Sequence, residues 1–143
     1  EVLQEYSEVA FLISEYNNWS QADYEKAVRA SLEKWGVSAA DVNTYIAALP
    51  AAGEQNVLNQ KYIALFTQFL EGWSEYRRTG YPEVIPVVRN SSNGTIDTQL
   101  QVRRLPYTRD EKINNASGVA SGISALGGQD TGGTKLWWDK KSR

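Results

Sequence analysis

The sequence contains no cysteine, no histidine and no methionine among its 143 residues. Without cysteine the chain forms no disulfide, offers no thiol nucleophile and builds no zinc–thiolate site. Without histidine it lacks the commonest general base and the commonest ligand of transition metals. We therefore expect no metal and no cofactor, and serine–histidine or cysteine–histidine catalysis within this chain is excluded.

Charge of one sign and long apolar runs are missing as well. Fifteen Lys and Arg residues against seventeen Asp and Glu residues leave a net charge of -2. Nucleic-acid binding usually requires a basic surface, so nucleic acid is not an expected partner. No apolar run reaches the roughly 18 residues of a membrane-spanning helix. Because the helical pattern opens directly at Glu1 with no methionine, we interpret the chain as the C-terminal part of a longer protein.

The first half of the sequence has the apolar periodicity of helices. Ser20 with Asp23, and Ser38 with Asp41, are N-cap signatures for a second and a third helix. Two helices joined by a short turn are typical of antiparallel pairs in helical repeat arrays. We expect helices over residues 2–17, 20–35 and 38–49 and one long central helix over about 55–79.

Apolar residues three and four positions apart predict which faces are buried. Gly80 and Pro82 are expected to end the central helix, and Glu75 is expected to pair with Arg77 or Arg78 at that exit. The predicted inward faces are Tyr6, Val9, Ala10, Ile13 and Tyr16, widened by Phe11 and Leu12, in the first helix, Tyr24, Ala27, Val28, Leu32 and Trp35 in the second, and Leu58, Tyr62, Phe66, Phe69, Trp73 and Tyr76 in the central one.

Beyond Pro82 the helical period disappears. The pair Asn93–Gly94 and the alternation that follows it predict a small hairpin at 86–104. One more helix is expected from Asp110 to near Leu126, carrying Ile113, Ala116, Ala120 and Ile123 inward, followed by a glycine-rich loop. The sequence thus predicts an all-α single domain over 1–143, with a helical array at 1–79 and a hairpin, one helix and loops at 80–143.

Aromatic residues are the main candidates for ligand contact. The sequence has five Trp and eight Tyr, and aromatic rings can stack on sugars or anchor protein partners. Trp35 and Trp73 lie on predicted helix faces and are expected to pack in the core. Trp19, in a turn, and Trp137 and Trp138, after a loop, are the candidate binding residues, although packing is the favoured interpretation for them too.

Two other motifs are weaker. Glu71 and Glu75 lie four apart, and paired carboxylates carry glycoside hydrolysis, but this spacing is generic and local pairing of Glu75 with an arginine explains it better. The glycines of 128–135 resemble a phosphate-binding loop, yet Thr134 precedes Lys135 and no strand leads into the loop. We therefore reject the phosphate loop and regard catalysis by the two glutamates as the less favoured interpretation.

At this point the sequence resembles the SusD/RagB family of bacterial surface lipoproteins, over nearly its whole length. The order and spacing of several segments carry the resemblance, and Ser14 stands where the family usually has Ala. The matching segments are 7–15 (SEVAFLISE), 24–36 (YEKAVRASLEKWG), 60–66 (QKYIALF), 71–82 (EGWSEYRRTGYP), 104–107 (RLPY), Glu111 with Asn114 or Asn115, and 136–139 (LWWD).

The resemblance implies an all-α fold with tetratricopeptide-like helix pairs, in the C-terminal portion of a protein several times longer. It implies a non-catalytic, nutrient-binding protein on the outer membrane, anchored through a lipidated N-terminal Cys that this chain lacks. Its implied partners are a SusC-like TonB-dependent transporter, a glycan or other nutrient, and the missing N-terminal part of the same protein. The matched motifs look structural in the family, so no binding residue is carried over from it.

Two competing functions remain open. One is a helical-repeat scaffold for protein–protein interaction, which predicts an exposed apolar or charged groove on the helix pairs and no aromatic cluster on the loops. The other is a hydrolase fragment, which predicts two carboxylates about 5 to 9.5 Å apart in one cleft. We also expect an unusually apolar exposed face on the first helix and on part of the central helix.

Overall fold

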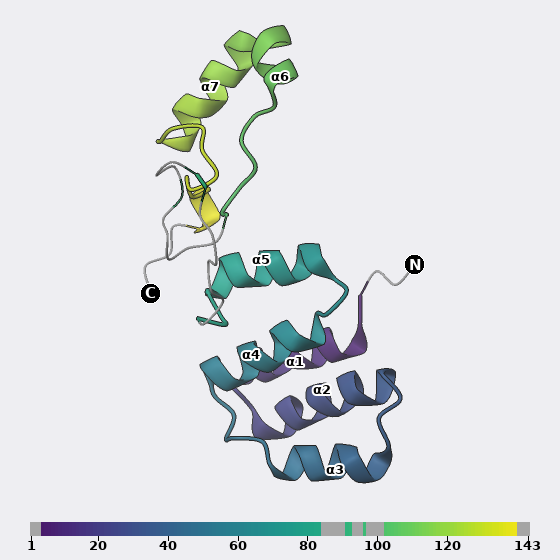
Figure 1. Ribbon diagram of the computed structural model, residues 1–143. Coiled ribbons are helices and arrows are strands. Elements are labelled where there is room, and N and C mark those ends of the chain that lie inside the picture. The colour runs from purple at the N-terminus through teal and green to yellow at the C-terminus, as the bar shows by residue number, and fades with distance from the viewer. Residues whose placement is uncertain (1–3, 84–90, 93–95, 97–101, 140–143) are drawn as a thin grey trace. The chain divides into compact units, whose positions relative to one another are not determined.

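The computed structural model describes residues 4–83, 91–92, 96 and 102–139 (Figure 1). These residues form seven α-helices and one short 3-10 helix, and none of them lies in a strand. The predicted all-α class is confirmed. The chain divides into two compact units, Glu1–Val84 (unit 1) and Ile85–Arg143 (unit 2), each of which is described by itself. No helix in the described ranges has the length and apolar character needed to cross a bilayer.

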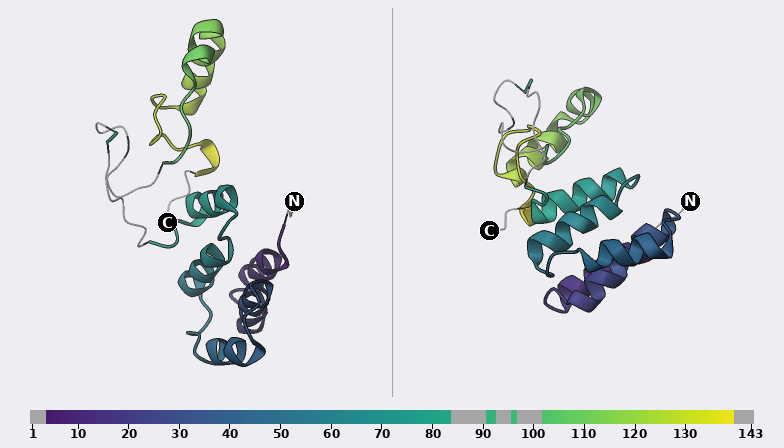
Figure 2. Two further views of the ribbon diagram at one scale, coloured as in Figure 1. Left: turned by 45° about the vertical axis from the view of Figure 1, so that its right-hand side comes forward. Right: turned by 60° about the horizontal axis from the view of Figure 1, so that its bottom comes forward.

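Unit 1 is a small helical array. Helices α1 and α2 form the predicted pair and lie side by side, with α3 and α4 against α2, α4 also against α1, and α5 against α4 (Figure 2). Ser20 and Ser38 cap α2 and α3 as predicted, their hydroxyls accepting from the backbone N–H of Asp23 and of Asp41. The helices span α1 Tyr6–Tyr16, α2 Gln21–Lys34, α3 Ala39–Ala47, α4 Glu54–Ala64 and α5 Phe69–Thr79.

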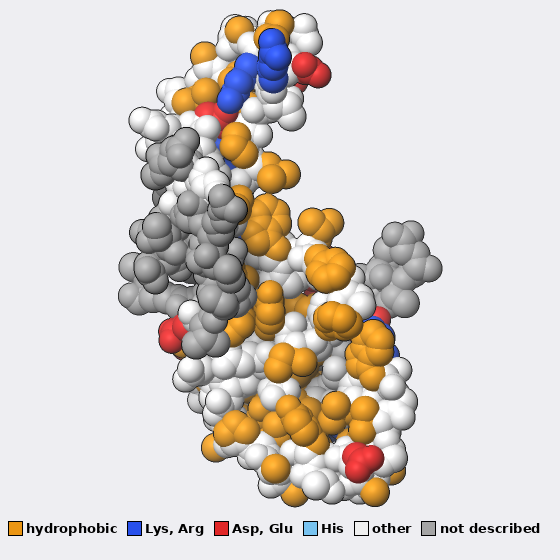
Figure 3. All heavy atoms as spheres, in the orientation of Figure 1, with side chains coloured by type: hydrophobic (Ala, Val, Ile, Leu, Met, Phe, Trp, Pro, Cys, Tyr) orange, Lys and Arg blue, Asp and Glu red, His pale blue; other side chains and the backbone are white. Residues whose placement is uncertain are grey.

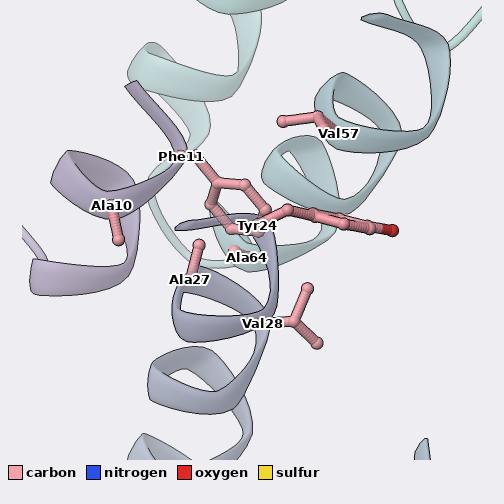
Figure 4. Close-up of a cluster of buried hydrophobic side chains, with 7 residues drawn as sticks. All are labelled: Ala10, Phe11, Tyr24, Ala27, Val28, Val57 and Ala64. Atoms are coloured by element: carbon pink, nitrogen blue, oxygen red, sulfur yellow. The ribbon is translucent and has the colours of Figure 1, made fainter. Parts of the chain in front are cut away.

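The core of unit 1 lies between α1, α2 and α4 (Figure 4). Its largest members are Phe11 and Tyr24, whose ring centroids are 6.4 Å apart. Ala10 and Ala27 are small enough to let α1 and α2 approach closely. Burial of the Tyr24 phenol raises its pKa to about 12. The full cluster is Ala10, Phe11, Tyr24, Ala27, Val28, Val57 and Ala64.

The predicted inward face of α1 is confirmed at Ala10 and Phe11 and wrong at its exposed members. The buried side chains form an inner row of Ser7, Ala10, Phe11 and Ser14, whereas Tyr6, Ile13 and Tyr16 are exposed. The inner row is buried because the small residues beside Phe11 permit close packing against α2. The hydroxyl of Ser14 donates to the backbone carbonyl of Ser20 at 2.9 Å, which makes a fully buried serine acceptable.

The predicted long central helix is also wrong, since it is two helices. α4 ends at Ala64 and α5 begins at Phe69, and Thr67 between them has a left-handed backbone with φ 78°. Gly72 of α5 faces Tyr62, with 3.8 Å between the ring and the position a Cβ would take at residue 72. The break thus folds α5 back onto α4, and this tertiary contact has no signal in the helical period.

Burial along the predicted central face is correspondingly uneven. Leu58 and Tyr76 are buried as predicted, and Tyr62 and Trp73 are partly buried, whereas Phe66 and Phe69 are exposed. Trp35, expected in the core of α2, is also exposed, and its ring centroid lies 6.0 Å from that of Phe66. Gly80 ends α5 in the predicted left-handed conformation, with φ 73°.

Unit 2 contains α6 Arg109–Asn114, α7 Ala116–Leu126 and the 3-10 helix η1 Trp137–Asp139. One helix was expected where α6 and α7 lie, but Asn115, with φ -137° and ψ 47°, interrupts it. Val119 is the one buried residue in these two helices. The predicted inward positions Ile113, Ala116 and Ala120 are exposed, so the prediction is wrong for them. Ile123 is partly buried. The predicted hairpin at 86–104 lies largely outside the described residues.

Candidate binding surface

The two C-terminal tryptophans lie on a short helix that is anchored from beneath. Trp137 is 84% exposed and Trp138 is 36% exposed, while Asp139 is buried. The carboxylate of Asp139 pairs with the guanidinium of Arg103, itself buried, through two hydrogen bonds, one of which measures 2.8 Å from Nε. A bidentate pair of this kind fixes orientation as well as position, so η1 presents Trp137 from a rigid base.

The loop before η1 is held by a second buried ion pair. Asp130 accepts hydrogen bonds from Arg104 at 2.6 Å and from the backbone N–H of Tyr107 at 3.1 Å, and it forms an ion pair with Nζ of Lys112 at 2.7 Å. Burial by itself would raise the pKa of Asp130, but these donors outweigh it and lower the pKa to about 2. The carboxylate therefore stays ionised and ties α6 to the loop.

Backbone contacts complete the anchor. The N–H of Arg103 donates to the carbonyl of Gly132 at 2.8 Å, and Gly132 is buried. A Cβ on Gly132 would lie 3.1 Å from the side chain of Ile96 and 3.5 Å from the Arg104 carbonyl. A larger residue at 132 would therefore force the two segments that this hydrogen bond joins to move apart. These arginine–aspartate pairs were not predicted from the sequence. The Arg103–Arg104 pair outside any helix was the only available signal.

Trp19, the third candidate, is placed differently. It lies in the turn between α1 and α2 with a left-handed backbone, φ 64°, and it packs against the core cluster of unit 1. It lies in unit 1, whereas Trp137 and Trp138 lie in unit 2. Trp19 is only partly exposed, so less of its ring is available for stacking than in Trp137.

The two glutamates considered for catalysis have unequal environments. Glu71 is exposed, whereas Glu75 is buried and pairs with Nζ of Lys61 at 3.0 Å and with Arg78 at 2.6 Å. Burial would raise the pKa of Glu75, but the hydrogen bond from Arg78 and the charge of Lys61 outweigh it and lower the pKa. A general acid needs the opposite shift, so Glu75 acts as a structural carboxylate.

The predicted pairing of Glu75 with Arg78 is thus confirmed, and it belongs to a larger set. Arg78 also binds Glu15 of α1 through two bonds of 2.7 Å, and the bond to Glu15 raises the pKa of this guanidinium. We call Glu15, Arg78, Glu75 and Lys61 the charge network. Arg77, the alternative partner, instead lies 3.8 Å from the ring centroid of Trp73. No group of three or more His, Cys, Asp or Glu suited to a metal ion occurs among the described residues.

Comparison with solved structures gives consistent relatives. A chitin-binding SusD homolog from Flavobacterium johnsoniae is 34% identical, with a TM-score of 0.78, and the match covers 95% of this chain and 36% of that one. A SusD homolog from Bacteroides vulgatus is 32% identical with a TM-score of 0.79, covering 95% and 35%. A SusD-like protein from Bacteroides thetaiotaomicron is 30% identical with a TM-score of 0.78, covering 95% and 36%. The chain therefore spans about a third of the length of these relatives.

A search of curated proteins gives no match. A family model described as SusD-like, the Susd and RagB outer membrane lipoproteins, matches residues 54–139. That match includes α4, α5 and all of the described part of unit 2, and the solved relatives extend it over α1 to α3. The chain belongs to the SusD-like family of outer membrane lipoproteins.

Proposed function

We propose that the protein binds a glycan at the outer surface of a bacterial cell, without catalysis, and delivers it to a SusC-like TonB-dependent transporter. The observation that carries the proposal is the 34% identical relative over 95% of this chain, whose description is a chitin-binding SusD homolog. A second relative, 30% identical, is described as a chitin-binding protein. Lipid anchoring through an N-terminal Cys belongs to the same proposal, supported by the family's description as outer membrane lipoproteins.

Trp137 is the residue of this chain best suited to contact a sugar. Its ring is largely exposed, and the Arg103–Asp139 pair holds the short helix that carries it. An aromatic face stacks on the apolar face of a pyranose ring, and a backbone that is already held in place loses little entropy on binding. Trp138 lies beside it and is the second candidate. Trp19 packs against the core of unit 1, so we expect its removal to lower stability more than affinity.

The binding test uses the full-length protein and isothermal titration calorimetry. Chito-oligosaccharides are titrated first and malto-oligosaccharides second. We expect Trp137→Ala to weaken binding about tenfold, the loss of one stacking contact. Trp35→Ala is the matched control, because Trp35 is also an exposed tryptophan but lies in unit 1, where it packs beside Phe66.

The outcomes separate function from site. Failure of both oligosaccharide series to bind the wild-type protein would overturn glycan binding. Normal binding by Trp137→Ala would leave glycan binding standing and remove Trp137 from the site. The competing scaffold function draws support from the exposed apolar residues Ile63, Phe66, Phe69 and Leu70 around the α4–α5 turn. It predicts no glycan affinity together with loss of a protein partner in Phe69→Ser.

A further inference from the structure

We infer that the junction of α1 and α5 responds to protonation: Glu8 and Glu71 face each other there, repel near neutral pH and let the two helices pack more firmly in mild acid. These two carboxylates lie beside the charge network, so that four glutamates share the two cations Lys61 and Arg78. Few charged side chains appear on the face of unit 1 that Figure 3 shows, so this gathering of charge is a distinct feature of the unit.

The register of the two helices places Glu8 opposite Glu71. Arg78 of α5 donates to both carboxylate oxygens of Glu15 of α1 at 2.7 Å, which makes these two residues partners across the junction. Glu8 lies seven positions before Glu15, and Glu71 lies seven positions before Arg78. Seven residues are two helical turns, about 10.5 Å along the axis, and return a side chain to the same helix face. Since α1 and α5 run in the same direction (Figures 1 and 2), the junction pairs opposite charges at one end and like charges two turns earlier.

The nearby cations are engaged elsewhere. No ion pair of Glu8 or Glu71 occurs among the described residues. The ammonium of Lys61, which comes from α4, is bound to Glu75 at 3.0 Å. On α2, Lys34 is bound to Glu5 at 2.8 Å, one turn before Glu8 on α1.

The surroundings of Glu8 therefore disfavour its charged form. Burial raises the pKa of this carboxyl above its ordinary value, and the charges of Glu71 and Glu75 raise it further. The charge of Lys61 and the backbone of Glu5 act in the opposite direction without cancelling the rise. Because Glu71 appears among the charges that act on Glu8, the electrostatics agree with the register.

The sign of the effect follows from this rise. Just above the ordinary pKa of 4.5, the folded chain binds a proton at Glu8 that the unfolded chain does not, so stability increases as pH falls through this range. A proton taken from solvent by Glu8 removes one of the two facing charges and leaves the Glu15–Arg78 pair intact. Asp130 has a lowered pKa and destabilises the protein only at lower pH, so the two responses differ in sign and in range.

The test is amide hydrogen exchange of the full-length protein at about pH 7 and about pH 5, corrected for the intrinsic pH dependence of exchange. We expect the protection of α5 to increase at least about twofold at the lower pH in the wild type. Glu8→Gln is uncharged at both pH values, so its α5 should be protected at pH 7 as the wild type is at pH 5, without a pH response. Glu54→Gln is the matched control, because it removes an exposed glutamate of α4 and should leave the response unchanged.

A second variant keeps the test decisive. Glu71→Gln removes the facing charge from an exposed position and should also increase the protection of α5 at pH 7. A pH response in Glu8→Gln and Glu71→Gln equal to that of the wild type would overturn the inference. Protection of wild-type α5 that is constant or lower at pH 5 would overturn it too. None of these outcomes depends on which glycan, if any, the protein binds.

Discussion

At the scale of single residues, the most unusual feature is a lysine in the core of unit 1. The side chain of Lys61 is 3% exposed and its Nζ lies 3.0 Å from Glu75. Placing a charge where water cannot reach it is costly unless an opposite charge and hydrogen bonds compensate. Glu75 does this for Lys61, and Arg78 in turn satisfies Glu75, so each group in the charge network depends on its neighbour.

We expect Lys61→Met to lower the free energy of unfolding by roughly 3 kcal/mol, because it leaves Glu75 buried with one cation fewer. The pKa of Glu75 should rise, since burial raises it and the lysine charge no longer opposes that effect. Urea unfolding of the full-length protein measures the loss. Lys26→Met is the control: its pair with Asp23 is exposed, and such pairs contribute about 0–1 kcal/mol. Equal losses in the two variants would contradict a structural role for the network.

Residue-scale contacts also show what a sequence can predict. The Ser20 and Ser38 caps and the Glu75–Arg78 pair join residues three apart, and all three were predicted correctly. Glu15 and Arg78 are 63 positions apart, and Arg103 and Asp139 are 36 apart. Such pairs depend on how helices meet, which the periodicity of one helix does not encode. The base beneath Trp137 was therefore missed, although Trp137 itself was a candidate.

At the scale of elements, the turn between α4 and α5 decides the shape of unit 1. The apolar period runs through it without interruption, and neither glycine nor proline marks it. Thr67 nevertheless adopts φ 78°, a conformation that is costly for a β-branched residue. Gly72 of α5 lies against Tyr62 of α4, and tertiary packing of this kind is what holds a residue in a sparsely populated conformation.

Replacing Thr67 should therefore stabilise the protein. We expect Thr67→Asn to raise the free energy of unfolding by about 0.5–1 kcal/mol, because Asn tolerates the left-handed region and Thr67 is exposed, so no packing is lost. Thr67→Val keeps the β-branch and should give no gain. Thermal unfolding of the two variants beside the wild type measures the difference. If residue 67 lay in a continuous helix, Asn would bring no gain in stability over Thr. A Thr67→Asn variant that is less stable than the wild type would therefore contradict a left-handed turn at this position.

At the scale of the whole molecule, the chain corresponds to about a third of the length of its solved relatives. α1 was predicted to bury Tyr6, Ile13 and Tyr16, and these side chains are exposed in the chain as it stands. The periodicity correctly identified these residues as one apolar face of the helix. It does not show which part of the protein, if any, covers that face. The exposure of Tyr6, Ile13 and Tyr16 confirms the expected apolar surface on the first helix. The exposure of Phe66 and Phe69 confirms it for part of the predicted central helix.

Acid should weaken unit 2 through Asp130. The pKa of this carboxyl is about 2 in the folded protein against an ordinary value of 3.8, so below pH 4 the unfolded chain binds a proton that the folded chain does not. Stability is therefore lost as pH falls from about 4 toward 2. We expect amide hydrogen exchange in 102–139 to speed up over this range, and Asp130→Asn to be less stable at pH 6 but less sensitive to acid. An unchanged acid response in Asp130→Asn would contradict the assignment.

The buried Lys61 also makes it possible to measure, by chemical labelling, whether α4 and α5 are folded together. Lys26 and Lys135 reach solvent, whereas Lys61 is sealed in the core by Glu75. An acylating reagent added to the protein would therefore modify Lys26 and Lys135 and leave Lys61 unmodified for as long as α4 and α5 remain folded together. The ratio of acylation at Lys61 to acylation at Lys26 would rise with the fraction of molecules in which α4 and α5 have separated, and mass spectrometry of one digest would measure it.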